Sequence, residues 1–120
     1  MQTNPFKDQT DFMSACDQTV DSYNQTQFEL YKNLIKEEFE ELQEAYDMEQ
    51  ELDALIDILV VTIGAINSMG ADGEGAWNEV MRTNFAKIDP ETGKVRKRSD
   101  GKILKPDNWQ APELSKFLKK

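Results

Sequence analysis

Residues 28–69 read FELYKNLIKEEFEELQEAYDMEQELDALIDILVVTIGAINSM, and this stretch decides the fold. Its apolar residues recur every three to four positions, which is the spacing of an amphipathic helix. The pattern predicts one helix over residues 28–46 and a second over residues 50–69. Long helices joined by a short break indicate a helical bundle.

Further helices flank this pair. The turn-like Asn4-Pro5 precedes a helix expected over residues 7–20. The glycine-rich residues 70–75 end the second long helix, and a fourth helix is expected over residues 74–85 with Asp72 as its N-cap. The side chains expected on one side of the first helix are those of Phe12, Met13 and Cys16.

From Ala86 on, glycine and proline interrupt a basic segment. Asp100-Gly101, between KVRKR and KILK, is a hairpin-type turn signal, and a short amphipathic helix is expected near residues 114–118. This segment is either a clasp across a neighbouring helix or subunit, or a basic lid.

The chain is therefore expected to be an all-α bundle of four to five helices, forming a single domain over residues 1–120. Residues 1–86 would form the helical core, and residues 87–120 a C-terminal extension with a short β-hairpin. With 38% hydrophobic residues in 120, the core is small for a protein that works alone. The nearly all-round apolar helix after residue 50 should be buried on nearly every side, so we expect a homodimer or homotetramer.

Composition excludes several classes of site. The chain has no histidine and one cysteine, Cys16, which rules out zinc fingers, Ser-His-Asp triads and internal disulfides. The N-terminus lacks the layout of a signal peptide, and the longest apolar stretch is too short to cross a bilayer. A cytoplasmic location is the expectation.

Charge divides unevenly along the chain. Residues 1–75 contain 17 Asp/Glu and 3 Lys/Arg, whereas residues 76–120 contain 6 and 11. An acidic half rarely faces nucleic acid, so a small polyanion bridged by a divalent metal fits better than a duplex, and no membrane partner is expected. The alternative is two solvated faces of opposite sign.

The first long helix carries carboxylates in two different settings. With Tyr31 taken as zero, the apolar residues occupy an arc of about 300° to 60°, and Glu38 falls inside it at about 340°. Glu41, at about 280°, and Glu37, at about 240°, border the same arc. A solvated acidic helix explains the carboxylates on the far side but not Glu38. Those on the far side are Glu40 and Glu44.

The second long helix carries Asp53 and Asp57 in one narrow polar strip, with Gly64 between them in angle. Burying two carboxylates costs several kcal/mol per ion unless they are protonated, paired or metal-bound. Four carboxylates from two helices would offer only oxygen ligands, which select Mg²⁺ or Mn²⁺. No calcium-binding loop motif is present. A buried acidic pair satisfied by Lys or Arg is the alternative.

These residues resemble the MazG-like, all-α NTP pyrophosphohydrolases. Residues 37–42, EEFEEL, match their EExxE signature, and residues 53–61, DALIDILVV, resemble their second acidic helix. The sequence from residue 81 on looks like the phosphoribosyl-ATP-pyrophosphohydrolase-like branch often encoded by phages, including DGKILKP at residues 100–106. The residues there that match recurring positions of this branch are Arg82, Asn84 and Lys87.

The chain departs from the superfamily pattern at one motif, which is usually written ExxD. Three residues before Asp57 lies Ala54, and three before Asp53 lies Gln50, so a glutamate is missing in either register. Asp53, one turn before Asp57, can substitute geometrically. The number of metal ions is therefore left open.

The resemblance implies water attack at the α-phosphorus of a nucleoside triphosphate, giving the monophosphate and pyrophosphate. Metal held by Glu38, Glu41, Asp53 and Asp57 would activate the water, with Glu37 or Glu38 accepting its proton. Substrate contacts would come from Arg82, Asn84 and Lys87.

Three functions stay open at this point. The substrate is a (d)NTP, with a purine such as dGTP favoured, or it is phosphoribosyl-ATP, because the motifs do not separate these enzymes. The third is a non-catalytic helical module that binds metal or a partner. Phe12, Trp77 and Trp109 can stack on a base, but aromatic residues in small helical proteins more often belong to the core.

Overall fold

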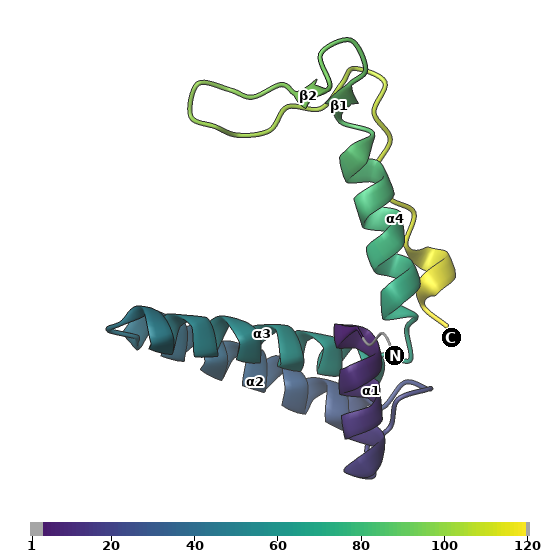
Figure 1. Cartoon of the computed structure of the whole chain (residues 1–120). Coiled ribbons are helices and arrows are strands. Elements are labelled where there is room, and N and C mark those ends of the chain that lie inside the picture. Colours follow the sequence, from purple (N-terminus) through teal and green to yellow (C-terminus); the bar gives the residue numbers. More distant parts are fainter. Residues whose placement is uncertain (1–3, 120) are drawn as a thin grey trace. The chain divides into compact units, whose positions relative to one another are not determined.

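The computed structural model describes residues 4–119. Among these residues no helix has both the length and the apolar character needed to cross a membrane. The expected all-α fold is confirmed. The elements, drawn in Figure 1, are helices α1 (Pro5–Ala15), α2 (Gln25–Glu44), α3 (Met48–Ser68) and α4 (Gly73–Phe85), strands β1 (Ile88–Asp89) and β2 (Lys94–Val95), and a 3-10 helix, η1 (Ser115–Phe117).

The described residues form two compact units. The first contains α1, α2 and α3 together with the chain from Phe117 on. The second contains residues 74–116, which are α4 beyond its first residue, the β1–β2 hairpin and most of the C-terminal segment.

Helices α2 and α3 lie side by side in the first unit, as Figure 1 shows. Each begins two to three residues earlier than the apolar periodicity predicted, because a polar side chain caps it. The Asn24 side chain accepts a hydrogen bond from the Gln27 backbone N–H at 3.1 Å, and Asp47 accepts one from Gln50 N–H at 2.8 Å. The caps, rather than the first apolar residue, set where each helix starts.

A close approach at Gly64 fixes how α3 packs on α2. A Cβ atom at this position would lie 2.7 Å from Tyr31 Cζ, closer than real Cβ contacts allow. The Tyr31 ring is buried with Met13 and Ala65, and its hydroxyl donates a hydrogen bond to Gln18 Oε1 at 2.5 Å. The glycine thus lets an aromatic ring sit directly against the α3 backbone.

The start of α2 is also bonded to the end of α3. The Asn24 N–H donates to the Ser68 carbonyl oxygen at 2.8 Å. The Gln27 amide donates to Ser68 Oγ at 2.9 Å and to the Thr19 carbonyl oxygen at 2.7 Å. Because Ser68 is fully buried, these bonds satisfy polar groups that water cannot reach.

Helix α1 differs from its expected bounds and its expected face. Asn4 is its N-cap and Pro5 its first residue, and it ends before Asp17, whose φ is 59°. Of the three side chains expected together on one side, Met13 is fully buried, whereas Phe12 and Cys16 are exposed. The helix therefore contributes a narrower face to the core than predicted.

Helix α3 is not buried on every side within the described part of this single chain, so its burial on nearly every side, which was expected together with a homo-oligomer, stays a prediction. Only α1 and α2 pack against it extensively, so one apolar side faces outward. The exposed apolar side chains of this face, named below the α3 face, are Leu52, Leu55, Ile56, Leu59 and Val60.

The basic segment contains the predicted turn and, before it, a pair of strands that was not predicted. The paired strands are β1 and β2, with Ile88 opposite Val95, and the turn between them includes Gly93 at φ 71°. The predicted turn at Asp100-Gly101 also joins two paired segments. Lys97 and Ile103 form an antiparallel bridge, the Arg98 N–H donates to the Lys102 carbonyl oxygen at 2.7 Å, and the Leu104 N–H donates to the Arg96 carbonyl oxygen at 2.8 Å. The expected helix near residues 114–118 is the single 3-10 turn η1.

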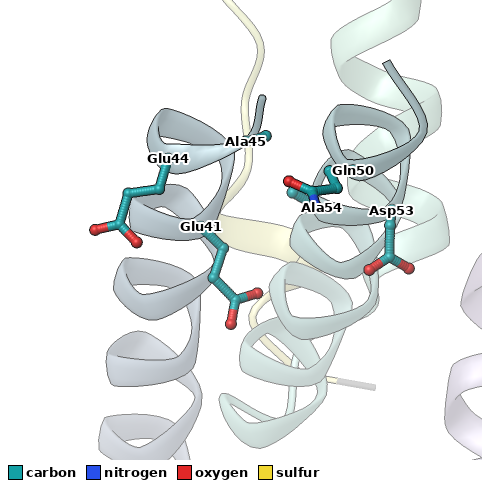
Figure 2. Close-up of a pocket in the computed structure, with 6 residues that line it drawn as sticks. All are labelled: Glu41, Glu44, Ala45, Gln50, Asp53 and Ala54. Atoms are coloured by element: carbon teal, nitrogen blue, oxygen red, sulfur yellow. The ribbon is translucent and has the colours of Figure 1, made fainter. Parts of the chain in front are cut away.

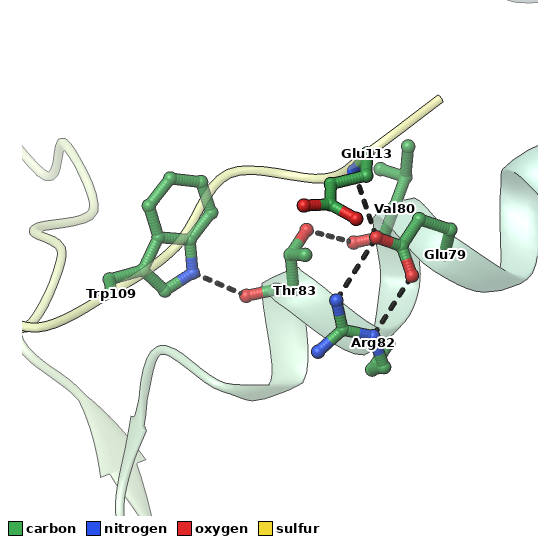
Figure 3. Close-up of polar contacts among 6 residues, drawn as sticks. All are labelled: Glu79, Val80, Arg82, Thr83, Trp109 and Glu113. Atoms are coloured by element: carbon green, nitrogen blue, oxygen red, sulfur yellow. Dashed lines mark hydrogen bonds and ion pairs between the residues drawn. The ribbon is translucent and has the colours of Figure 1, made fainter. Parts of the chain in front are cut away.

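Two anchors hold the C-terminal segment along α4 in the second unit (Figure 3). Trp109 Nε1 donates a hydrogen bond to the Thr83 carbonyl oxygen at 2.6 Å, and the Glu113 N–H donates to Glu79 Oε2 at 2.9 Å. Arg82 also pairs with Glu79, at 2.9 and 3.0 Å. The hydrogen bonds from Arg82, followed by the one from the Glu113 N–H, lower the pKa of the Glu79 carboxyl to about 2.

Candidate metal centre

The packing of α2 on α3 brings carboxylates from both helices together. Glu38 lies seven residues after Tyr31, and Asp57 lies seven residues before Gly64. Seven residues are close to two helical turns, so each carboxylate lies on the face of its helix that makes the Tyr31–Gly64 contact. The contact that joins the helices therefore also aligns their acidic residues.

Three carboxylates form a compact cluster. One oxygen from each of Glu38, Glu41 and Asp57 lies within 4.8 Å of the other two. Glu38 and Asp57 are half-buried and Glu41 is exposed. Oxygens from two helices at this spacing can ligate a single cation.

Glu38 is the residue that an acidic surface helix does not explain. Its Oε2 atom is buried and has no hydrogen-bond partner in the described part of the chain. Burial, followed by the hydrogen bond and negative charge of Glu41 and the charges of Asp57 and Asp53, raises the pKa of Glu38 to about 7. Burial and the charges of Asp53 and Glu41 also raise the pKa of Asp57.

The cluster fits a hard cation better than an internal ion pair. The described ion pairs of the chain include none of its three carboxylates. A buried carboxylate oxygen without a partner and a set of oxygen-only ligands suit Mg²⁺ or Mn²⁺. This arrangement does not correspond to the alternative of a buried acidic pair satisfied by Lys or Arg.

Two further predicted site residues lie beside the cluster. Asp53 is exposed and outside the three-carboxylate group, although its charge acts on both Glu38 and Asp57. Glu37 is exposed. The cluster therefore contains three of the four predicted ligands, and Asp53 lies outside it.

A cavity of about 300 Å³ opens where α2 ends and α3 begins. Figure 2 shows that Glu41 points from α2 toward α3, whereas Glu44 points away. Asp53 lines the same cavity from α3, so two predicted ligands border it. The lining residues are Glu41, Glu44, Ala45, Gln50, Asp53 and Ala54.

Gln50, which stands where the superfamily motif has a glutamate, contributes to a helix cap. Its backbone N–H bonds to the Asp47 side chain, and its Oε1 accepts a hydrogen bond from the Tyr46 N–H at 3.2 Å. The sequence signal was the spacing of Asp47 and Gln50, which is typical of a reciprocal N-terminal cap. The side-chain oxygen that would ligate a metal is used by the backbone.

The predicted substrate residues all lie in the second unit. Arg82 forms the ion pair with Glu79, and Lys87 Nζ donates a hydrogen bond to Asn84 Oδ1 at 3.1 Å. Lys87 Nζ also lies 5.1 Å from the centre of the Trp109 ring. Of the three, Lys87 is therefore the cation without a carboxylate partner among the described residues.

The aromatic residues behave differently from the core residues they were expected to be. Phe12 and Trp77 are exposed, and Trp109 is half-buried against α4. The anchoring roles of Trp109 and Glu79 were not predicted from the sequence. Both depend on contacts with residues more than twenty positions away, for which the local pattern gives no signal.

Comparison with known proteins adds one match. The model of the phosphoribosyl-ATP pyrophosphohydrolase family matches residues 11–84, which contain α2, α3 and the acidic cluster. No curated protein matches the chain.

Proposed function

Because the chain belongs to the phosphoribosyl-ATP pyrophosphohydrolase family, within the MazG-like all-α NTP pyrophosphohydrolases, we propose that it hydrolyses a (d)NTP to the (d)NMP and pyrophosphate. Family membership makes the chain a nucleotide pyrophosphohydrolase. The proposal adds the substrate, a nucleoside triphosphate, with a purine such as dGTP favoured. The observation that carries it is the cluster of Glu38, Glu41 and Asp57.

We propose Mg²⁺ as the cofactor, with Mn²⁺ as the second candidate. Glu38, Glu41 and Asp57 would hold the ion, and Asp53 would join them or neutralise part of its charge from one turn away. When bound, such an ion neutralises phosphate oxygens and makes a water molecule more acidic. The unpartnered Glu38 Oε2 supports this assignment.

The proton of the attacking water is assigned to Glu38 or Glu37. The pKa of Glu38 is raised to about 7 in the metal-free protein, and a bound cation would lower it, so the support for Glu38 as the base is its place in the carboxylate cluster. Glu38 has two oxygens, so one can contact the ion while the other accepts the proton. Glu37 is exposed and adjacent, which makes it the second candidate base.

Arg82, Asn84 and Lys87 are proposed to bind the nucleotide. Lys87 is the stronger source of positive charge for the departing pyrophosphate, because the charge of Arg82 is already compensated by Glu79. The Asn84 amide, which holds the Lys87 ammonium, can orient a phosphate or the sugar.

Phosphoribosyl-ATP is the second candidate substrate, and the description of the matched family favours it. A pyrophosphate-release assay with canonical and modified dNTPs and NTPs and with phosphoribosyl-ATP, with and without Mg²⁺, separates the two. Turnover of a dNTP several orders of magnitude above that of phosphoribosyl-ATP is the expected result. The reverse order would assign the second function, and no release with any substrate would leave a non-catalytic module.

A further inference from the structure

Two lysine ammonium groups share one aromatic ring in the second unit. Lys87 Nζ is 5.1 Å and Lys105 Nζ is 4.7 Å from the centre of the Trp109 ring, so the two nitrogens lie less than about 10 Å apart. Aromatic faces attract cations, and indole does so most strongly. The ring therefore holds two like charges near each other.

The position of this ring is fixed by the backbone. Trp109 Nε1 donates to the Thr83 carbonyl oxygen at 2.6 Å, and its own N–H donates to the Pro106 carbonyl oxygen at 3.1 Å. Asn84 Oδ1 accepts a hydrogen bond from Lys87 Nζ at 3.1 Å. The ammonium of Lys87, two residues after the end of α4, thus contacts both the Asn84 side-chain oxygen and the Trp109 ring.

The charge around this pair is not neutralised. Residues 87–106 contain seven Lys/Arg and three Asp/Glu. Among the described residues, the one ion pair within this segment joins Arg98 and Asp100, and neither Lys87 nor Lys105 takes part in an ion pair. Two fixed ammonium groups without carboxylate partners are suited to an anion with several charged oxygens.

We infer that Lys87 and Lys105, whose ammonium groups both contact the Trp109 ring, form a binding site for a small polyphosphate, and that this site binds the phosphate chain of the nucleotide. The second half of this statement rests on the proposed function. Lys105 is then a further substrate-binding residue, and Trp109 is a positioning residue that acts through both lysines.

A small polyanion fits the pair better than a nucleic acid does. Binding to a nucleic acid backbone draws its strength from many phosphate contacts along a tract. The pair is compact, and the whole chain carries a net charge of -9, which repels a long polyanion.

The test is calorimetric titration of inorganic tripolyphosphate into the full chain in EDTA, where no turnover occurs. Lys105→Met should weaken binding by about tenfold or more, and Lys105→Arg should retain most of it. Lys102→Met is the matched control, because it removes the same charge from the same exposed segment without touching Trp109. Its effect should stay below about threefold.

Trp109 is tested with two substitutions in the same titration. Trp109→Phe keeps an aromatic face and should retain more affinity than Trp109→Leu, which removes the cation–π contact altogether. Both lose the Nε1 hydrogen bond, so a purely structural role would affect them equally. Equal losses would overturn the positioning role.

Three results would overturn the site itself. They are no tripolyphosphate binding by the parent chain, equal losses for Lys105→Met and Lys102→Met, or tighter and Lys105-dependent binding of a single-stranded oligonucleotide. Failure of the proposed function is distinguishable. A chain that binds tripolyphosphate through Lys105 but hydrolyses no nucleotide contradicts the function and the assignment of the site to a nucleotide, but not the polyphosphate site. A chain that hydrolyses nucleotides, and whose Lys105→Met variant binds tripolyphosphate as tightly as the parent, contradicts only this site.

Discussion

Glu38 is the residue whose burial and acidic neighbours give the strongest support for a functional role. Its Oε2 atom is buried without a hydrogen-bond partner in the described chain, and the groups that perturb it are all acidic. Such a side chain opposes folding when it is ionised, because one of its oxygens is shielded from water and its neighbours are negatively charged. A residue that costs stability in the metal-free protein is better explained by its function than by its packing.

The substitution Glu38→Gln keeps the shape of the side chain and removes its charge. We expect turnover to fall by at least about a hundredfold while the protein stays folded, because the charge of the proposed base and metal ligand is lost. The measurement is pyrophosphate release alongside thermal melting. Glu40→Gln, on the exposed side of the same helix, is the matched control and should keep nearly full activity. Full activity in folded Glu38→Gln would remove Glu38 from the site.

The same variant should change how stability depends on pH in EDTA. The pKa of Glu38 is about 7 in the folded protein and about 4.5 in the unfolded chain, so the folded state binds this proton more tightly. The stabilisation from the protonated group is full below pH 4.5 and is lost as pH rises to about 7. Urea melts should show a smaller loss over this range for Glu38→Gln, and identical slopes would contradict the raised pKa.

At the scale of elements, the close contact that packs α2 on α3 also aligns the carboxylates of the candidate metal centre. The Tyr31 ring packs where Gly64 has no side chain, and the same faces carry Glu38 and Asp57 two turns away. Anything that separates the two helices near Tyr31 should therefore also spread the carboxylates. Packing and ligand geometry are coupled in this pair.

Gly64→Ala tests that coupling. The added methyl group would overlap the Tyr31 ring, at a cost of about 1–3 kcal/mol, which exceeds the roughly 0.5–1 kcal/mol gained from alanine in a helix. We expect net destabilisation in urea melts. Combined with Tyr31→Leu, Gly64→Ala should cost less than it does alone, which a double-mutant cycle measures. Additive effects would mean that the ring does not limit the approach of α3.

A metal ion bound between the helices should stabilise both at once. At a hundredfold excess over its dissociation constant, Mg²⁺ should add about 2.7 kcal/mol to the free energy of unfolding, and Asp57→Asn should abolish that gain. Melts of both proteins with EDTA and with millimolar Mg²⁺, repeated with a non-hydrolysable triphosphate, provide the measurement. A parent melt indifferent to Mg²⁺ under both conditions would count against the site.

The sequence predicted what is local and periodic. Helical spacing predicted α2, α3 and α4 to within a few residues, and the angular position of Glu38 predicted a half-buried carboxylate. It did not predict the exposed Phe12, because periodicity shows that a residue is apolar and not which neighbour covers it. The turn signal at Asp100-Gly101 predicted the pairing around Gly101, whereas the pairing of β1 with β2 around Gly93 was not predicted.

At the scale of the whole molecule, the two charge classes separate along the chain. The acidic residues of the candidate metal centre lie in the first unit, and the unneutralised lysines lie in the second. Carboxylates suit a metal cation and lysines suit a polyphosphate, so each charge class matches one of the two proposed ligands. The division of charge is therefore more than a solubility feature under the proposed function.

The α3 face is a second feature of the whole molecule that a single chain does not explain. Leu52 is 61%, Ile56 50% and Leu59 54% exposed, although they belong to one helix face. Beside them, residues of α1 and α3 border an apolar hollow of about 400 Å³. Contiguous apolar surface of this kind usually marks an interface.

We therefore predict a homo-oligomer, a dimer or a tetramer, that buries the α3 face. Light scattering at micromolar concentration should give a mass at least twice 13.8 kDa. Leu59→Glu should shift the protein toward the monomer, because a charge buried in an apolar interface is unpaired and costly. Leu114→Glu, the same substitution at an exposed leucine of the second unit, is the control and should leave the mass unchanged. A parent chain that stays at 13.8 kDa would show that the α3 face is not covered by a second copy.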